Sequence, residues 1–359
     1  MSAQLQITHP RDGDVLNRHD GTETEEEILV PVRGTARGMA TVDVNGTQVP
    51  VTNGEFACEV ALSKKRSAIV ATAGADRHEI TVLWTRGSRK RYRFSLDDNI
   101  LFLRDLGLHP EEYNSIFDHW YLGFWRQMHQ EYGTKVHVNI YYQTEGFDLT
   151  QMPDKWRDEW QENAWWLHLS FHALQNEPNR IYRNATYAQM AHDYDLVCGH
   201  IRRFAGNEVI SNTTTVHWAE CPRGAAVALR DRGIENLIGL FWVRNGACNT
   251  GYYHCPEHCE YCHSRDAWHD TDTGLTFVSC DAVVNGLAVE QIGPHLDERE
   301  ASAHTCEMIE LLIHEQYFRK DLERYYQPTI KNKARTAIEW VAQRGYEPVF
   351  WGDGHLGMV

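Results

Sequence analysis

The chain of 359 residues carries 35 lysines and arginines against 50 aspartates and glutamates, a formal net charge of -15. Nucleic acids and anionic membranes bind basic surfaces, so this charge argues against both as main partners and favours a neutral or cationic ligand. No apolar run reaches the length of a membrane span, and the first residues, MSAQLQITHPRDGD, lack the basic and apolar regions of a signal peptide. We therefore expect a cytoplasmic protein whose nine scattered cysteines are reduced.

Residues 1–88 form a series of short alternating runs separated by turns. Asn45-Gly46, between TVDV and TQVPV, is a strong signal for a two-residue hairpin. About six or seven short strands in this length predict a β-sandwich of immunoglobulin type. The segment resembles the bacterial Ig-like modules that accompany carbohydrate-active enzymes, through its opening from Ile7 to Leu16 and its Val44-Asn45-Gly46 turn.

The pattern changes after a basic linker, TRGSRKR, at residues 85–91. From residue 89 to 359 strand patterns alternate with longer helical patterns, as in an α/β protein. About seven or eight such repeats favour a distorted (β/α) barrel. The predicted organisation is therefore multidomain, an all-β sandwich at 1–88 followed by a barrel at 89–359.

The first strand of the barrel ends in two aspartates. Polar and apolar residues alternate from Arg91 to Leu96, so this strand delivers Asp97 and Asp98 to its C-terminal end, where α/β barrels keep their chemistry. Two neighbouring carboxylates repel each other when both are ionised. Such a pair is useful if one binds a cation and the other holds or removes a proton. The alternative is a turn and a helix cap shared with Asn99.

Histidines follow two further strand patterns. The run WWLHLSFHA at residues 165–173 places His168 and His172 four apart, where they can face one point if the segment is helical or sharply turned. Neutral imidazole suits Zn²⁺ and related transition metals. His314 ends the apolar run from Met308 to Ile313 and is expected at the same barrel mouth. Its alternative role is a capping or surface histidine.

These three elements together resemble the polysaccharide deacetylase family, which has an aspartate pair after its first strand, an H-[ST]-x-x-H pair and a late L-x-H. Here they are Ser95-Leu96-Asp97-Asp98, the His168 to His172 run and Leu312-Ile313-His314. The resemblance implies a divalent metal, most readily zinc, on Asp98, His168 and His172. It also implies Asp97 as general base, His314 as general acid and an acetylated carbohydrate as substrate.

The sequence is also compatible with other functions. We expect Trp166, His217 and Trp242 to contact a sugar, and the barrel could be a catalytically divergent or inactive carbohydrate-binding scaffold. A glycoside hydrolase would need two acids, for which Glu220 and Glu315 follow strand ends.

One cysteine motif indicates a different function. Cys255, Cys259 and Cys262 have the C-x3-C-x2-C spacing with which radical enzymes using S-adenosylmethionine hold an iron–sulfur cluster, although here it lies late in the barrel pattern. Adventitious zinc binding and incidental loop cysteines are the alternatives. About one transition metal per chain would support the deacetylase, iron with sulfide would support the radical enzyme, and no metal would support the glycoside hydrolase or the binding scaffold. The sequence does not indicate the oligomeric state.

Overall fold

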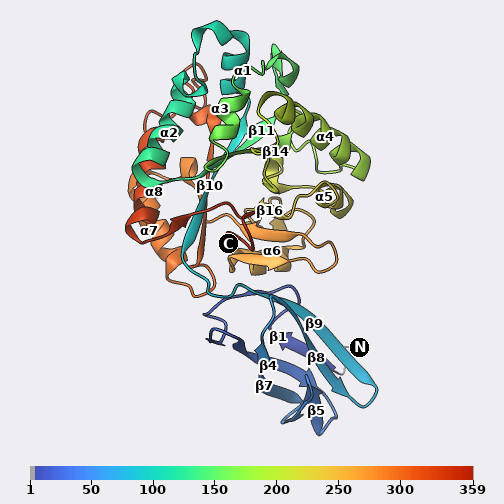
Figure 1. Cartoon of the computed structure of the whole chain (residues 1–359). Coiled ribbons are helices and arrows are strands. Elements are labelled where there is room, and N and C mark those ends of the chain that lie inside the picture. The colour runs from blue at the N-terminus through green and yellow to red at the C-terminus, as the bar shows by residue number, and fades with distance from the viewer. Residues whose placement is uncertain (1–4, 359) are drawn as a thin grey trace. The chain divides into compact units, whose positions relative to one another are not determined.

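A computed structural model describes residues 5–358, which divide into two compact units (Figure 1). The first unit comprises residues 5–89, 267–276 and 358, and the second comprises residues 90–266 and 277–357. Among the described residues, no helix combines the length and the apolar character that crossing a membrane requires.

The first unit is built from two β-sheets around a shared apolar core. One sheet contains β1 (Leu5–His9), β3 (Thr22–Glu23), β4 (Ile28–Ala36) and β7 (Glu55–Leu62), with β4 at its centre. The other has the order β2 (Val15–Leu16), β9 (Asp76–Trp84), β8 (Arg66–Ala73), β5 (Thr41–Val44) and β6 (Thr47–Pro50). β19 (Ala267–His269) also belongs to this unit.

Alternation along the strands explains this core. In β4 every second residue is buried, so Val30 and Val32 pack in one cluster with Ile69 of β8 and Val82 of β9. The predicted hairpin between β5 and β6 is present, and Asn45 and Gly46 both have positive φ, as a two-residue turn of this kind requires. The two-sheet architecture is thus observed, while its assignment to the immunoglobulin type stays a prediction.

The second unit is mixed α/β and contains two parallel sheets. The larger has the order β14 (Leu167–Ala173), β11 (Val136–Tyr141), β10 (Arg91–Asn99), β22 (Met308–His314) and β21 (Ala282–Val283), and β23 (Glu347–Pro348) also pairs with β10. The smaller contains β15 (Thr213–Thr214), β16 (Asn236–Gly239) and β20 (Thr276–Ser279). A parallel bridge between Leu169 and Ile210 joins the sheets at one seam, which gives a barrel-like arrangement.

Helices alternate with these strands (Figure 1). They are α1 (Leu101–Leu108), α2 (Trp120–Tyr132), α3 (Arg157–Glu162), α4 (Tyr187–Phe204), α5 (Arg223–Arg230), α6 (Pro256–His263), α7 (Val289–Glu300) and α8 (Ile330–Gln343). Two small hairpins interrupt the pattern, β12–β13 (Gln143–Thr144 and Phe147–Asp148) and β17–β18 (Val243–Arg244 and Ala247–Cys248).

Charged groups fill part of the interior of the second unit. β10 is buried on both faces, and its alternation sends Arg91, Arg93, Ser95 and Asp97 to one side and its apolar residues to the other. Arg93 forms a bidentate ion pair with Glu310 of β22, with N–O distances of 2.7 and 2.9 Å, and both side chains are fully buried. The row of buried polar side chains on this face of β10 therefore extends to Asp97, near the C-terminal end of the strand.

Candidate metal centre

One carboxylate and two imidazoles converge at the C-terminal ends of the barrel strands. Asp98 Oδ1 of β10 lies 3.0 Å from His172 Nε2 of β14 and 3.2 Å from His217 Nδ1, which follows β15. The two imidazole nitrogens lie 3.3 Å apart. One carboxylate oxygen and two imidazole nitrogens in this arrangement are a donor set that suits Zn²⁺ and related transition metals, and three protein ligands leave further positions open.

The structure brings together two of the three predicted metal ligands and leaves His168 out. β14 is a continuous strand from Leu167 to Ala173, not a helix or a sharp turn, so residues four apart are separated by about 13 Å. His168 lies lower in the barrel, where its ring stacks on Phe350 at 3.7 Å between centroids. Burial lowers its pKa to about 4, which keeps the ring neutral. His217, predicted as a sugar contact, occupies the third place instead.

Two residues that the sequence motifs did not indicate hold the group in place. The Tyr141 hydroxyl, at the end of β11, hydrogen-bonds to Asp98 Oδ1 and lies 2.8 Å from His217 Nδ1. Gln316 donates its amide to the other Asp98 oxygen at 2.7 Å. Asp98 itself has a φ of 60°, a conformation that turns its side chain away from the regular strand. In the sequence, only the position of Tyr141 at the end of a predicted strand could have indicated that it belongs to the site.

The charges of the group stabilise one another. Burial acts to raise the pKa of Asp98, but the charge of His314 and the hydrogen bonds from His172 and His217 outweigh it and hold this pKa well below its usual value. Burial acts to lower the pKa of His172, whereas its hydrogen bond to Asp98 and the charges of Asp97 and Asp98 raise it above its ordinary value. Asp98 is therefore ionised over the whole physiological range.

Asp97 and His314, the predicted base and acid, flank this group on adjacent strands. They are partners in the parallel register of β10 and β22. Asp97 Oδ1 accepts hydrogen bonds from Ser95 Oγ at 2.8 Å and from Asn139 Nδ2 at 2.6 Å. His314 Nδ1 lies 2.8 Å from Asn285 Oδ1, which fixes the orientation of the ring.

A chain of hydrogen bonds connects Asp97 with the buried ion pair lower in the barrel. Asn139 donates to Asp97 and accepts from Ser170 Oγ, and Ser170 lies 2.8 Å from His137 Nε2. The other nitrogen of His137 contacts the Arg93 guanidinium, which is paired with Glu310. The orientation of Asp97 is thus set by residues on three neighbouring strands.

The predicted sugar-contacting tryptophans lie in different environments. Trp166 is 1% exposed, stacks on Phe117 and donates its indole N–H to Asn163. It is therefore a core residue, and the prediction that it contacts a sugar is wrong. Trp242 is partly buried at the base of the β17–β18 hairpin, with the Arg244 guanidinium 5.2 Å from its ring. Trp218, which follows His217, is 41% exposed and lies 4.6 Å from the Arg180 guanidinium.

The two glutamates of the glycosidase alternative are engaged in other contacts. Glu315 is buried and accepts the backbone N–H groups of Ile100, Leu101 and Phe102, so it caps the start of α1. Glu220 pairs with Arg180 at 2.9 Å and lies 3.6 Å from Arg183. Neither carboxylate belongs to the Asp98 group.

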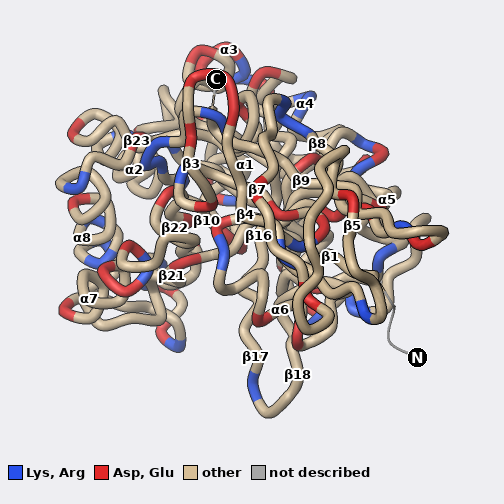
Figure 2. Tube along the Cα trace, turned by 90° about the horizontal axis from the view of Figure 1, so that it is seen from below, with Lys and Arg blue, Asp and Glu red and all other residues tan. Residues whose placement is uncertain are grey.

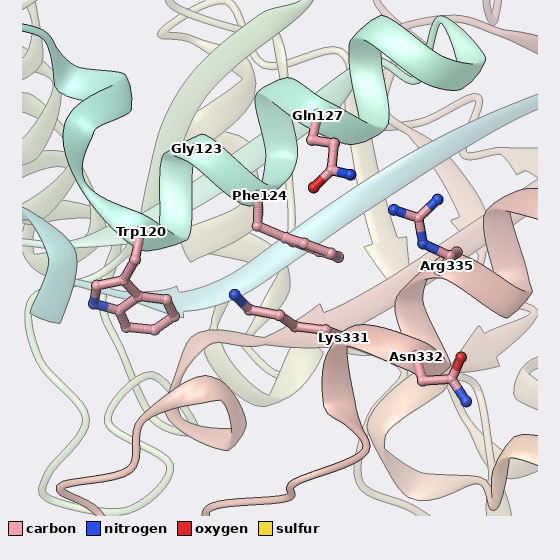
Figure 3. Close-up of a pocket in the computed structure, with 7 residues that line it drawn as sticks. All are labelled: Trp120, Gly123, Phe124, Gln127, Lys331, Asn332 and Arg335. Atoms are coloured by element: carbon pink, nitrogen blue, oxygen red, sulfur yellow. The ribbon is translucent and has the colours of Figure 1, made fainter.

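A groove of about 530 Å³ lies between α2 and α8 (Figure 3). The Lys331 ammonium lies between the Trp120 and Phe124 rings, 5.6 and 5.4 Å from their centroids. A second cavity of about 510 Å³ shares Trp120 and Lys331. Among the described residues, neither lining includes Asp98, so both cavities are separate from the candidate metal centre.

No protein-family model matches the sequence, and no curated protein matches it. Solved structures with general similarity to the chain include the following three. A 4-alpha-glucanotransferase from Thermococcus litoralis is 10% identical with a TM-score of 0.44, over 71% of this chain and 38% of that one. A CE4 family pseudoenzyme from Bacillus anthracis is 9% identical with a TM-score of 0.34, over 72% and 63%. A mutant CE4 family pseudoenzyme is 8% identical with a TM-score of 0.33, over 76% and 74%.

The chain spans 38% of the glucanotransferase and 63% of the first pseudoenzyme, which is less than two thirds of either. All three TM-scores are below 0.5, so these similarities say nothing about the chemistry of the site.

Proposed function

We propose that the second unit is a metal-dependent hydrolase that removes acetyl groups from a carbohydrate. One observation carries the proposal: Asp98, His172 and His217, from three separate strand ends, bring their donor atoms to within 3.3 Å of one another. A carboxylate and two imidazoles can hold Zn²⁺ with positions left for water and a substrate oxygen. When bound there, the ion would lower the pKa of a water molecule and polarise the acetyl carbonyl.

Asp97 is the proposed general base. It lies next to Asp98 in the chain, is 2% exposed, and is held through one oxygen by Ser95 and Asn139. A carboxylate held in this way can take the proton of the attacking water without first reorganising. The two neighbouring aspartates therefore have different tasks, because Asp98 supports the cation and Asp97 moves the proton.

His314 is the proposed general acid. Its Nδ1 faces Asn285, which leaves Nε2 to carry the proton that the departing group needs. The leaving nitrogen or oxygen of the sugar takes that proton as its bond to the acetyl carbon breaks, and acetate and the deacetylated sugar result. The exposed ring of Trp218, next to His217, is a suitable platform for a sugar face.

An inactive carbohydrate-binding barrel is the second candidate, and a specific observation supports it. Tyr141 and Gln316 already supply hydrogen bonds to both oxygens of Asp98, so the group is satisfied without a cation. Metal content and acetate release separate the two candidates. The hydrolase proposal expects about one zinc equivalent per chain that depends on His172, together with release of acetate from an acetylated sugar or a small acetate ester.

The experiment compares the purified wild-type chain with a His172→Ala variant. Elemental analysis is expected to show loss of that equivalent in the variant, and acetate release is expected to fall to background. Wild-type protein that keeps no metal after dialysis against zinc, or that releases acetate equally well in the variant, would contradict the proposal.

A further inference from the structure

The helix α6 contains three cysteines on one face, and one of them lies close to a fourth cysteine from the preceding hairpin. Cys255, at the N-cap of the helix, and Cys259 and Cys262 within it are four and seven residues apart, a spacing that places their side chains along the same helical face. Cys248 ends β18, and the hairpin β17–β18 packs against α6. Figure 2 shows this hairpin projecting beside the helix.

Two of the sulfurs are in direct contact. The side chains of Cys248 and Cys259 hydrogen-bond to each other, and Gly251 lies against both. A Cβ atom at Gly251 would be 2.4 Å from Cys259 Sγ and 2.7 Å from Cys248 Sγ, so only glycine leaves room for this pair. The glycine thus brings the backbone close to the thiols without filling the space between them.

The helix α6 itself buries few side chains. The buried residues of α6 are Cys259 and Cys262 alone, whereas α2 buries leucine, methionine, phenylalanine, tyrosine and tryptophan. Most residues of the β17–β18 hairpin are exposed. A short hairpin and an eight-residue helix that bury so few side chains of their own can gain stability from a bound metal, as small structural elements commonly do.

We propose that Cys248, Cys255, Cys259 and Cys262 bind a structural Zn²⁺ ion that fixes the β17–β18 hairpin to α6. Four thiolates form a closed tetrahedral site with no position for substrate, unlike the Asp98 group. In a tetrahedral site with Zn–S bonds of about 2.3 Å, neighbouring sulfurs are about 3.8 Å apart, which suits two thiols already within hydrogen-bonding distance. An iron–sulfur cluster holds its cysteines farther apart, so zinc is the ion that this contact favours.

The test measures metal in the full-length chain. Wild-type protein is expected to hold a zinc equivalent that is lost in Cys248→Ser and in Cys259→Ser and retained in Cys58→Ser, which removes a thiol of the other unit. Replacing zinc by Co²⁺ is expected to give a thiolate-to-cobalt charge-transfer band that disappears in Cys259→Ser. The band should persist in His217→Ala, because that variant affects only the candidate metal centre. Failure of the proposed hydrolase is therefore distinguishable from failure of this site.

Two further measurements test the zinc site without replacing a cysteine. Titration of the wild-type chain with a mercurial reagent should release about one zinc as about four thiols react, and Gly251→Ala, which keeps all four thiols, should weaken zinc retention at least tenfold. Zinc content that is equal in wild type and Cys259→Ser would overturn the proposal. So would iron with acid-labile sulfide in place of zinc, or a cobalt spectrum without a thiolate band.

Discussion

Asp97 of β10 and His314 of β22 are direct partners in the parallel pairing of the two strands. Parallel register places both side chains at the same height of the barrel, on adjacent strand ends, with Asp98 one residue further along. The proposed base and acid are thereby fixed on neighbouring strands beside the carboxylate that would support the cation.

Replacing Asp97 by asparagine should leave metal binding intact and remove turnover. The amide keeps the size of the side chain but cannot accept a proton, so the rate constant for acetate release is expected to fall by about 10²–10⁴-fold. Steady-state kinetics and elemental analysis on the same preparation test this. Loss of metal together with activity would mean that Asp97 is a ligand and not a base.

Asn285 should act as a positioning residue for His314. Its Oδ1 lies 2.8 Å from His314 Nδ1, so Asn285→Ala is expected to lower kcat by about 10- to 100-fold while KM changes little. Asn285→Asp keeps an acceptor at this position and should restore most of the rate while moving the alkaline limb of the pH profile upward. An unchanged pH profile in the aspartate variant would exclude this role.

The stability of the second unit should fall at acidic pH partly through Asp105. Burial acts to raise the pKa of Asp105, but the hydrogen bonds and charges of His119 and Arg319 bring it to about 2, below its ordinary value of 3.8. Because the native value is lower than the unfolded value, this stabilisation is present above pH 3.8 and is lost as the pH falls towards 2.

The corresponding experiment compares unfolding free energies of wild type and Asp105→Asn across this range. The carboxylate is partly exposed and therefore screened, so the difference at neutral pH should not exceed about 1–2 kcal/mol. It is expected to shrink between pH 4 and pH 2. A difference that stays constant with pH would show that the pairing of Asp105 has no electrostatic basis.

The buried ion pair in the barrel should be far more important than a surface pair. Arg93→Met leaves the Glu310 carboxylate buried without its partner and is expected to lower the free energy of unfolding by about 3–5 kcal/mol. Arg230→Ala removes an exposed pair with Asp231, and solvent screening should make its effect on the free energy of unfolding far smaller. Urea unfolding followed by tryptophan fluorescence measures both, because most tryptophans lie in the second unit. Equal losses in the two variants would contradict the importance of the interior pair.

Local patterns in the sequence predicted local structure well. The alternation in β4 and the Asn45-Gly46 turn depend on neighbouring residues only, and both are present. The strand that carries Asp97 and Asp98 is also present and ends at Asn99, and strands alternate with helices in the second unit as predicted. These features follow from periodicities that a strand or a turn imposes on its own sequence.

Long-range convergence could not be predicted in the same way. His168 and His172 form a recognisable pair, yet a strand separates them by about 13 Å, and His217 comes from a segment 45 residues after His172. The sequence alone does not reveal that Trp166 is buried and Trp218 exposed, because the burial of each ring depends on tertiary packing. The hydrogen bonds from Tyr141 and Gln316 to Asp98 likewise depend on strand register and on the turn after β22.

The most direct test of the central claim is the zinc content of a matched pair of histidine variants. His217→Ala and His168→Ala each remove one imidazole from the second unit, but only the first removes a member of the Asp98 group. The account predicts that His217→Ala loses the zinc equivalent that wild type retains at this centre, whereas His168→Ala keeps it. Loss of that equivalent in His168→Ala with retention in His217→Ala would contradict the account.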